Sequence, residues 1–165
     1  MKLAIDIGNT LAKAAFFSEK GMSEVLVFDL NQTESLIEWL EKVSFSGVGM
    51  IASVKPVPEN LLNELASRIK ISVLDHSTSL PFKITYNTPE TLGRDRIAGV
   101  AAAFGAFPNQ NVLIIDMGTC ITYDILTAEG DYQGGAISPG INMRFAAMEA
   151  FTSRLPLANP TLSAP

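Results

Sequence analysis

A run of residues near the N-terminus has the side chains needed to bind phosphate: Asp6, Ile7, Gly8, Asn9, Thr10, Leu11, Ala12 and Lys13. Gly8 lets the backbone bend sharply and leaves main-chain N–H groups open to an anion. The Asn9 amide, the Thr10 hydroxyl and the Lys13 ammonium add donors for phosphate oxygens. Asp6 would repel phosphate, so it makes sense as a holder of hydrated Mg²⁺ that accompanies the phosphates. The run therefore predicts a nucleoside triphosphate site.

The same order of residue types returns in the second half of the chain. An apolar run over 112–115 is followed by Asp116, Gly118 and Thr119. Thr119 offers another hydroxyl to phosphate, and Asp116 is a candidate ligand for an accompanying cation. Each turn taken singly could be an ordinary hairpin turn, for which Asp, Gly and Asn are common residues. Their repetition after two apolar strands predicts two halves of related shape that face each other across a crevice.

A further acidic residue, Asp95, lies between Arg94 and Arg96 at the start of an expected helix. A carboxylate held beside positive charge is suited to accept a hydroxyl proton during phosphoryl transfer. A charge network that only stabilises the helix N-terminus is an equal alternative. Tyr86 comes shortly before this helix, where it could line the mouth of a cleft or cover the core as a rim residue.

The bulk composition limits the possible classes of protein. The 165 residues suffice for one ordinary domain or two small ones, and 47% apolar residues provide a sizeable core. The net charge of -5, without a dense Lys/Arg cluster, argues against a nucleic-acid surface. Cys120 is the single cysteine, which excludes an internal disulfide. Without a signal-peptide region or an apolar run near the ~20 residues of a membrane span, we expect a soluble, cytoplasmic protein.

The periodicity of apolar residues predicts an α/β fold with mixed sheets and flanking helices. Strands are expected over 2–6, 11–18, 23–28, 47–54, 71–74, 112–117, 121–128 and 132–137, and helices over 33–43, 56–69, 99–107 and 141–151. The last three strands repeat the opening meander. Residues 75–91 are expected to form a loop with a solvated His76, and Trp39 is expected to serve packing. We place the boundary between two halves at 108–111, giving residues 1–108 and 109–165.

A glycine-rich segment follows the last expected strand: Gly134, Gly135, Ala136, Ile137, Ser138, Pro139 and Gly140. Its glycines could bring the backbone close to whatever fills the cleft, because no Cβ stands in the way. A bulged strand end is the alternative interpretation.

Four motifs in this order resemble the type III pantothenate kinase family, which belongs to the acetate and sugar kinase/Hsp70/actin superfamily. They are Asp6-x-Gly8-Asn9-Thr10 with Lys13, Gly93-x-Asp95-Arg96, Asp116-x-Gly118-Thr119 and Gly134-Gly135-x-Ile137-x-Pro139-Gly140. The resemblance implies two ribonuclease-H-like halves of the actin-like ATPase fold, with ATP in the cleft. It also implies ATP-dependent phosphorylation of pantothenate to 4'-phosphopantothenate, the first step of coenzyme A biosynthesis. Mg²⁺, a monovalent cation (K⁺ or NH4⁺) and a homodimer formed through the helix after Asp95-Arg96 are further implications.

The resemblance also implies roles for individual positions of this chain. It places the phosphate loop on residues 6–13 and an ATP contact on Thr119. It places the general base on Asp95, the monovalent cation on Asp116, and the pantothenate contacts on Tyr86, Gly93, Arg94, Asp95 and Arg96.

The chain departs from the family pattern near its C-terminal end. Family members continue past the Leu-Pro at 155–156 with an Ile-Gly-x-Asn-Thr segment whose threonine touches pantothenate, and this sequence shows a short polar tail instead. We therefore expect an incomplete second half. Kinase activity is expected to be weak or absent, because water left in an open site weakens its charge interactions. A related small-molecule kinase and an inactive nucleotide-binding or regulatory remnant stay open as alternatives.

Overall fold

The computed structural model describes residues 1–158, which form two compact units. Unit 1 combines residues 1–79 with 90–98, and unit 2 combines residues 80–89 with the chain from residue 99 onward. The division into halves 1–108 and 109–165 follows the chain order and stays a prediction. The short polar tail expected after residue 160 lies outside the described residues.

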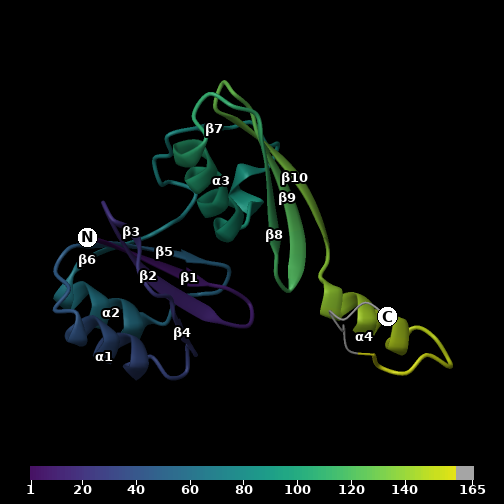
Figure 1. Ribbon diagram of the computed structural model, residues 1–165, viewed down its shortest axis with the longest axis horizontal. Helices are drawn as coiled ribbons and strands as arrows, with labels where there is room; N and C mark the ends of the chain where they lie inside the picture. The colour runs from purple at the N-terminus through teal and green to yellow at the C-terminus, as the bar shows by residue number, and fades with distance from the viewer. Residues whose placement is uncertain (159–165) are drawn as a thin grey trace. The chain divides into compact units, whose positions relative to one another are not determined.

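Within residues 1–158, six strands form the sheet of unit 1, in the order β3-β2-β1-β5-β6 with β4 paired to β2 (Figure 1). They are β1 Lys2–Ile7, β2 Ala12–Ser18, β3 Gly21–Met22, β4 Leu26–Phe28, β5 Val48–Ser53 and β6 Lys70–Val73. β1 is antiparallel to β2 and parallel to β5, and β5 is parallel to β6. The expected strand over 23–28 is wrong for residues 23–25, because two short strands, β3 and β4, pair separately with β2.

Two helices, α1 Glu34–Lys42 and α2 Glu59–Arg68, lie on the same face of this sheet (Figure 1). Leu36 and Leu40 of α1 are buried four residues apart, so one stripe of the helix faces the sheet. The start expected for α2 at residue 56 is wrong, since α2 begins at Glu59. Pro58 disfavours helical backbone at the residue before it, so the helix cannot begin earlier than this proline.

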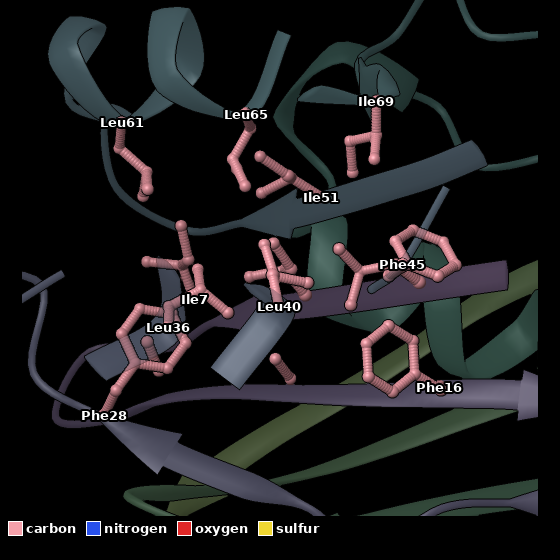
Figure 2. Packing of buried hydrophobic residues seen from close by; sticks show 14 residues of the cluster. Ile7, Phe16, Phe28, Leu36, Leu40, Phe45, Ile51, Leu61, Leu65 and Ile69 are labelled. Carbon is pink, nitrogen blue, oxygen red and sulfur yellow. The ribbon is translucent and has the colours of Figure 1, made fainter. Parts of the chain in front are cut away.

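The core of unit 1 fills the space between the sheet and the two helices (Figure 2). β1 contributes alternate residues, and Leu61 and Leu65 of α2 cover them from the helix layer. Phe16 stacks on Trp39 with ring centroids 4.3 Å apart and lies 4.8 Å from the ring of Phe45. The expectation that Trp39 serves packing is therefore confirmed.

Four strands form the sheet of unit 2 within the described residues, in the order β7-β10-β9-β8. They are β7 Lys83–Ile84, β8 Val112–Met117, β9 Cys120–Leu126 and β10 Asp131–Pro139. β8, β9 and β10 form an antiparallel meander, as expected. The expected loop over 75–91 is wrong in part, because it contains β7 and a short 3-10 helix, Pro89–Thr91. A strand of two residues is too short to show a hydrophobic period.

Helix α3, Arg94–Ala106, begins five residues before the expected start at 99, and helix α4 covers Ile141–Ala150. The carbonyl of Gly93 accepts a hydrogen bond from the N–H of Ile97 at 3.1 Å, which closes the first turn of α3. In unit 2, Gly99 of α3 packs near Ile114 of β8, and Phe104 lies 6.1 Å from the ring of Phe82. None of the helices in residues 1–158 has the length and hydrophobicity of a membrane span.

The loop after β6 is held by a local network around Asp75. Its carboxylate Oδ1 accepts hydrogen bonds from the N–H and the hydroxyl of Ser77 at 2.8 and 2.7 Å. These bonds lower the pKa of Asp75 below its usual value, because they favour the ionised form. His76 is exposed, which confirms the expectation of a solvated side chain.

Replacing Ile51 with Ala should destabilise unit 1 by about 2–5 kcal/mol, because a fully buried side chain would leave a cavity. Ile51 is 0% exposed in the middle of β5, whereas Val48 on the same strand is 47% exposed. The matched Val48→Ala change should therefore stay within about 0.5 kcal/mol of the parent protein. Urea unfolding followed by circular dichroism measures both, and equal losses from the two variants would contradict this core.

Candidate functional site

The first candidate phosphate turn connects β1 to β2. Ile7 pairs with Ala12 across the two strands, so residues 8–11 form the turn, and the N–H of Gly8 donates to the carbonyl of Leu11 at 3.0 Å. Asp6 lies directly opposite Lys13 in the antiparallel pair. Side chains at opposite positions share one face of a sheet, so this carboxylate and this ammonium flank the same end of the turn.

Burial divides the predicted phosphate loop into two kinds of residue. The side chains of Ile7 and Ala12 are buried in the core of unit 1, so they could meet a ligand only through their main chain. Asn9, Thr10 and Lys13 are exposed. The amide, hydroxyl and ammonium groups that sequence reasoning selected are therefore on the outer side of the turn, where an anion could reach them.

The structure adds a basic residue, Lys55, to this turn. Ile7 pairs with Ser53 where β1 and β5 run parallel, and the N–H of Val54 donates to the carbonyl of Ile7 at 3.0 Å. The ammonium of Lys55 then donates to the main-chain carbonyl of Asn9. The hydroxyl of Ser53 donates to the Lys55 carbonyl at 2.6 Å, which fixes the loop that carries the lysine.

Sequence reasoning missed Lys55, although one signal pointed to it. The residue lies two positions after an apolar strand that pairs in parallel with the strand of the phosphate turn. The carboxyl ends of parallel strands meet at one edge of a sheet, and ligands of open α/β sheets bind beyond that edge. Lys55 and the turn at 8–11 therefore belong to one candidate site in unit 1.

The predicted general base, Asp95, lies in the first turn of α3. Its Oδ1 accepts a hydrogen bond from the N–H of Arg96 at 2.9 Å. A Cβ on Gly93 would overlap this carboxylate oxygen, so a larger residue two positions before the acid would turn the carboxylate away from its present position. The guanidinium of Arg94 donates to the carbonyl of Leu92 at 2.9 Å, which holds the arginine beside the same helix start. The motif is thus locally ordered and half-buried.

The second candidate phosphate turn connects β8 to β9. The N–H of Gly118 donates to the carbonyl of Cys120 at 2.9 Å, and Asp116 is the exposed residue next to the last in β8. The N–H of Gly140 donates to the carbonyl of Thr119 at 3.1 Å, and a Cβ on Gly140 would lie 2.5 Å from the Gly118 carbonyl oxygen. The structure therefore joins the third and fourth sequence motifs into one site in unit 2.

Tyr86 lies against the same glycine-rich segment. A Cβ on Gly134 would come within 2.9 Å of Tyr86 Cε2, so the ring rests on bare main chain. The neighbouring Thr85 donates its N–H to the carbonyl of Tyr132 at 2.9 Å. Tyr86 is thereby attached to β10 in unit 2. The convergence of Asp6, Asp95 and Asp116 on one crevice stays a prediction.

The donor atoms of the two turns suit hard cations. Among the described residues, no group of three or more His, Cys, Asp and Glu side chains forms an all-protein metal site. Mg²⁺ commonly binds through one or two carboxylates together with substrate phosphates, and Asp6 beside the first turn fits that role. Asp116 precedes the main-chain carbonyls and the Thr119 hydroxyl of the second turn in the chain, and these are oxygen donors of the kind that hard cations prefer.

Solved structures identify the class of fold. A Baf family transcriptional activator from Campylobacter jejuni is similar with a TM-score of 0.50 and 24% identity, covering 96% of this chain and 68% of the other. The ethanolamine utilization protein EutJ from Carboxydothermus hydrogenoformans also gives a TM-score of 0.50, with 12% identity. This match covers 90% of this chain and 56% of the EutJ chain. The fold is that of the actin-like ATPases, a mixed α/β fold with helices on the sheets, as expected.

Sequence comparisons identify the family within that class. The type III pantothenate kinase model matches residues 2–165. A type III pantothenate kinase from Christiangramia forsetii is 46% identical over 162 residues, and one from Bacteroides fragilis is 45% identical over 161 residues. The chain belongs to the type III pantothenate kinase family. The two matches cover 97% and 96% of this chain. The chain spans only 66% and 65% of the length of the two relatives.

Replacing Gly140 with Ala should displace the Thr119 turn, because the new Cβ would overlap main-chain oxygens. We expect a loss of about 1–3 kcal/mol in the free energy of unfolding, typical of overpacking. Gly118→Ala is the matched control, since its Cβ would lie 3.9 Å from the nearest atom, the Cys120 carbonyl oxygen. Thermal unfolding and amide hydrogen exchange at residues 118–120 measure both changes. Similar behaviour of the two variants would show that Gly140 does not support the turn.

Proposed function

We propose that this chain provides nucleotide- and substrate-binding residues of an enzyme that transfers the γ-phosphoryl group of ATP to pantothenate. The product is 4'-phosphopantothenate, and the reaction is the first step of coenzyme A biosynthesis. The observation that carries this proposal is the family match over residues 2–165. The polar motifs within that range lie on two exposed turns and one helix start, where their donors can meet a ligand.

The proposed mechanism divides the work between a proton acceptor and a group of residues that hold the phosphates. Asp95 accepts the proton of the primary hydroxyl of pantothenate as that oxygen attacks the γ-phosphorus in line. The exposed turn that begins at Gly8 lets the phosphates approach closely, and the polar side chains of Asn9, Thr10 and Thr119 hold the phosphate oxygens. These contacts orient the γ-phosphoryl group relative to the attacking hydroxyl.

Charge in the proposed site comes from lysines and bound cations. Lys13 and Lys55 supply ammonium groups beside the first turn. Mg²⁺ held by Asp6 would neutralise part of the phosphate charge, and K⁺ or NH4⁺ would be held by Asp116. Arg94 and Arg96, which flank Asp95, can pair with the carboxylate of pantothenate, a planar anion that suits a guanidinium. Tyr86 and Gly93 complete the proposed pantothenate site.

Three further features belong to the proposal. A homodimer would use the small residues of α3, where Gly105 has open space around it and helices of two copies could approach closely. The two ribonuclease-H-like halves would enclose the nucleotide. The enzyme would act in the cytoplasm, where ATP and pantothenate are both present.

Replacing Asp95 with Asn should lower phosphoryl transfer about a hundredfold or more, because the amide cannot accept the hydroxyl proton. Binding of Mg·ATP should be unchanged within about twofold, since the phosphate turns are untouched. Single-turnover assays with the chain in excess over labelled ATP detect transfer to pantothenate even when turnover is slow. Titration calorimetry measures nucleotide binding.

Asp29→Asn is the control for this experiment, because Asp29 is an exposed acid in the loop after β4. Equal transfer by both variants and the parent chain would contradict the role of Asp95. Transfer to a sugar or a carboxylate in place of pantothenate would indicate a related kinase. Nucleotide binding without any transfer in the parent chain would indicate a non-catalytic binding protein.

Replacing Lys55 with Met should raise the Kd of Mg·ATP about tenfold, because one charged hydrogen-bond donor is lost beside the phosphate turn. Lys55→Arg keeps the positive charge and should bind nearly as well as the parent chain. Lys42→Met removes the same charge from the last turn of α1, which is not part of the proposed site, and should leave the Kd of Mg·ATP unchanged. Calorimetric titration at low and moderate salt compares them. A Kd unchanged in Lys55→Met would remove this lysine from the site.

A further inference from the structure

The ring of Tyr86 rests on Gly134 of β10, a position where two separate features of the structure favour glycine. A Cβ on Gly134 would overlap Cδ2 of the ring and lie 2.9 Å from Cε2 and 3.4 Å from Cγ. Gly134 also has φ +84, a backbone conformation that side chains rarely adopt. The first reason concerns contact and the second concerns the backbone. Any larger residue at this position therefore has to move either the ring or the strand.

The backbone of Gly134 is directed by a bulge in β10. Tyr132 pairs with Leu126 on β9, and Gly134 pairs with the preceding residue, Ile125, so Gln133 is an extra residue between them. Bulges bend a strand locally and redirect what it presents to its surroundings. Here the bulge brings a residue without a side chain to the ring of Tyr86.

The segment that carries Tyr86 is hydrogen-bonded to the residue just before the bulge. Ile84 of β7 pairs in parallel with Tyr132, and Thr85 donates both its N–H, at 2.9 Å, and its hydroxyl, at 3.1 Å, to the Tyr132 carbonyl. Lys83 donates its N–H to the Gly130 carbonyl at 2.9 Å. Tyr86 follows directly after these bonds, so the position of its main chain is set by Tyr132.

Tyr132 is in turn fixed inside unit 2. It is 0% exposed, and its hydroxyl donates to Oδ1 of Asp124 at 2.6 Å. Asp124 is 2% exposed, so a lost partner would leave part of a buried carboxylate without a hydrogen bond. Phe82 meets Tyr132 edge-on with ring centroids 6.2 Å apart. The hydrogen bond and the packing together hold β9 and β10 in one register at the bulge.

We propose that Asp124, Tyr132 and Gly134 form a seat that positions the Tyr86 ring for pantothenate. They act as positioning residues, because Gly134 contacts the ring and the buried Asp124–Tyr132 pair holds the strand that carries Gly134. The part of this proposal that concerns pantothenate rests on the proposed function. The seat itself rests on contacts within unit 2.

The position of the ring can be measured without any enzyme activity. The chain has three tyrosines, so incorporation of 3-fluorotyrosine gives three ¹⁹F resonances, which Tyr→Phe variants assign to Tyr86, Tyr123 and Tyr132. We expect Gly134→Ala to shift the Tyr86 resonance by more than its linewidth. Gly21→Ala is the matched control, because Gly21 also has a positive φ, +105, but a Cβ there would have no neighbour within 4 Å. A Tyr86 resonance that is the same in Gly134→Ala and the control would overturn the seat.

A second variant keeps the test decisive if Gly134→Ala does not fold. Tyr132→Phe removes only the hydroxyl that binds Asp124 and keeps the buried ring. It should shift or broaden the Tyr86 resonance, whereas Tyr123→Phe should leave that resonance in place. Equal effects of the two changes would overturn the role of the buried pair.

Pantothenate titration tests the function of the seat. Pantothenate should shift the Tyr86 resonance of the parent chain, and Gly134→Ala should raise its Kd about tenfold while the Kd of Mg·ATP stays unchanged. In a Tyr86→Ala background, Gly134→Ala should no longer change the pantothenate Kd, because the ring that it displaces is absent. A full tenfold effect in that background would overturn positioning through Tyr86.

The outcomes separate the seat from the proposed function. If Gly134→Ala shifts the Tyr86 resonance but pantothenate does not affect that resonance in the parent chain, the seat stands and the assignment of Tyr86 to pantothenate is overturned. If pantothenate shifts the Tyr86 resonance equally in both proteins and with the same Kd, the proposed function stands and the seat is overturned.

Discussion

The alternation of buried and exposed side chains along β1 is the constraint on which the candidate nucleotide site depends. Leu3, Ile5 and Ile7 point into the core of unit 1, so Asp6 must face outward. A slip of one residue would place the carboxylate in the core and the apolar residues in water, which costs several kcal/mol. Burial thereby sets the pairing of Asp6 with Lys13 and the position of the turn that follows.

Unit 2 repeats the strand–turn–strand arrangement, but a different interaction fixes its strand register. Its sheet exposes Leu113, Ile115 and Met117 along β8, so burial alone holds this strand less firmly than β1. The register of β9 and β10 is instead supported by the hydrogen bond between the buried Tyr132 and Asp124. A satisfied buried polar pair specifies one arrangement, because every alternative leaves a polar group unpaired.

Glycines allow close contacts within and between the sequence motifs. Gly140 approaches the main chain of the Thr119 turn, and Gly134 approaches the ring of Tyr86. At Gly93 the missing Cβ leaves room for the Asp95 carboxylate. In each case the contact is possible because the glycine has no Cβ, and it does not require a hydrogen bond from a side chain. The chemistry-bearing residues can therefore be recognised by type, whereas the residues that position them are small and inconspicuous.

The sequence alone determined the α/β class, the two Asp-x-Gly turns and Asp95 at a helix start, because residue type and local periodicity encode these features. Its four motifs also showed the resemblance to the family. It did not reveal the two-residue strand β7 or the contact of Lys55 with Asn9, which is 46 residues away. Tertiary structure alone decided these features, and also the support of Tyr86 by Gly134. Strand pairing, register and close packing depend on which distant segments meet, and no local pattern carries that information.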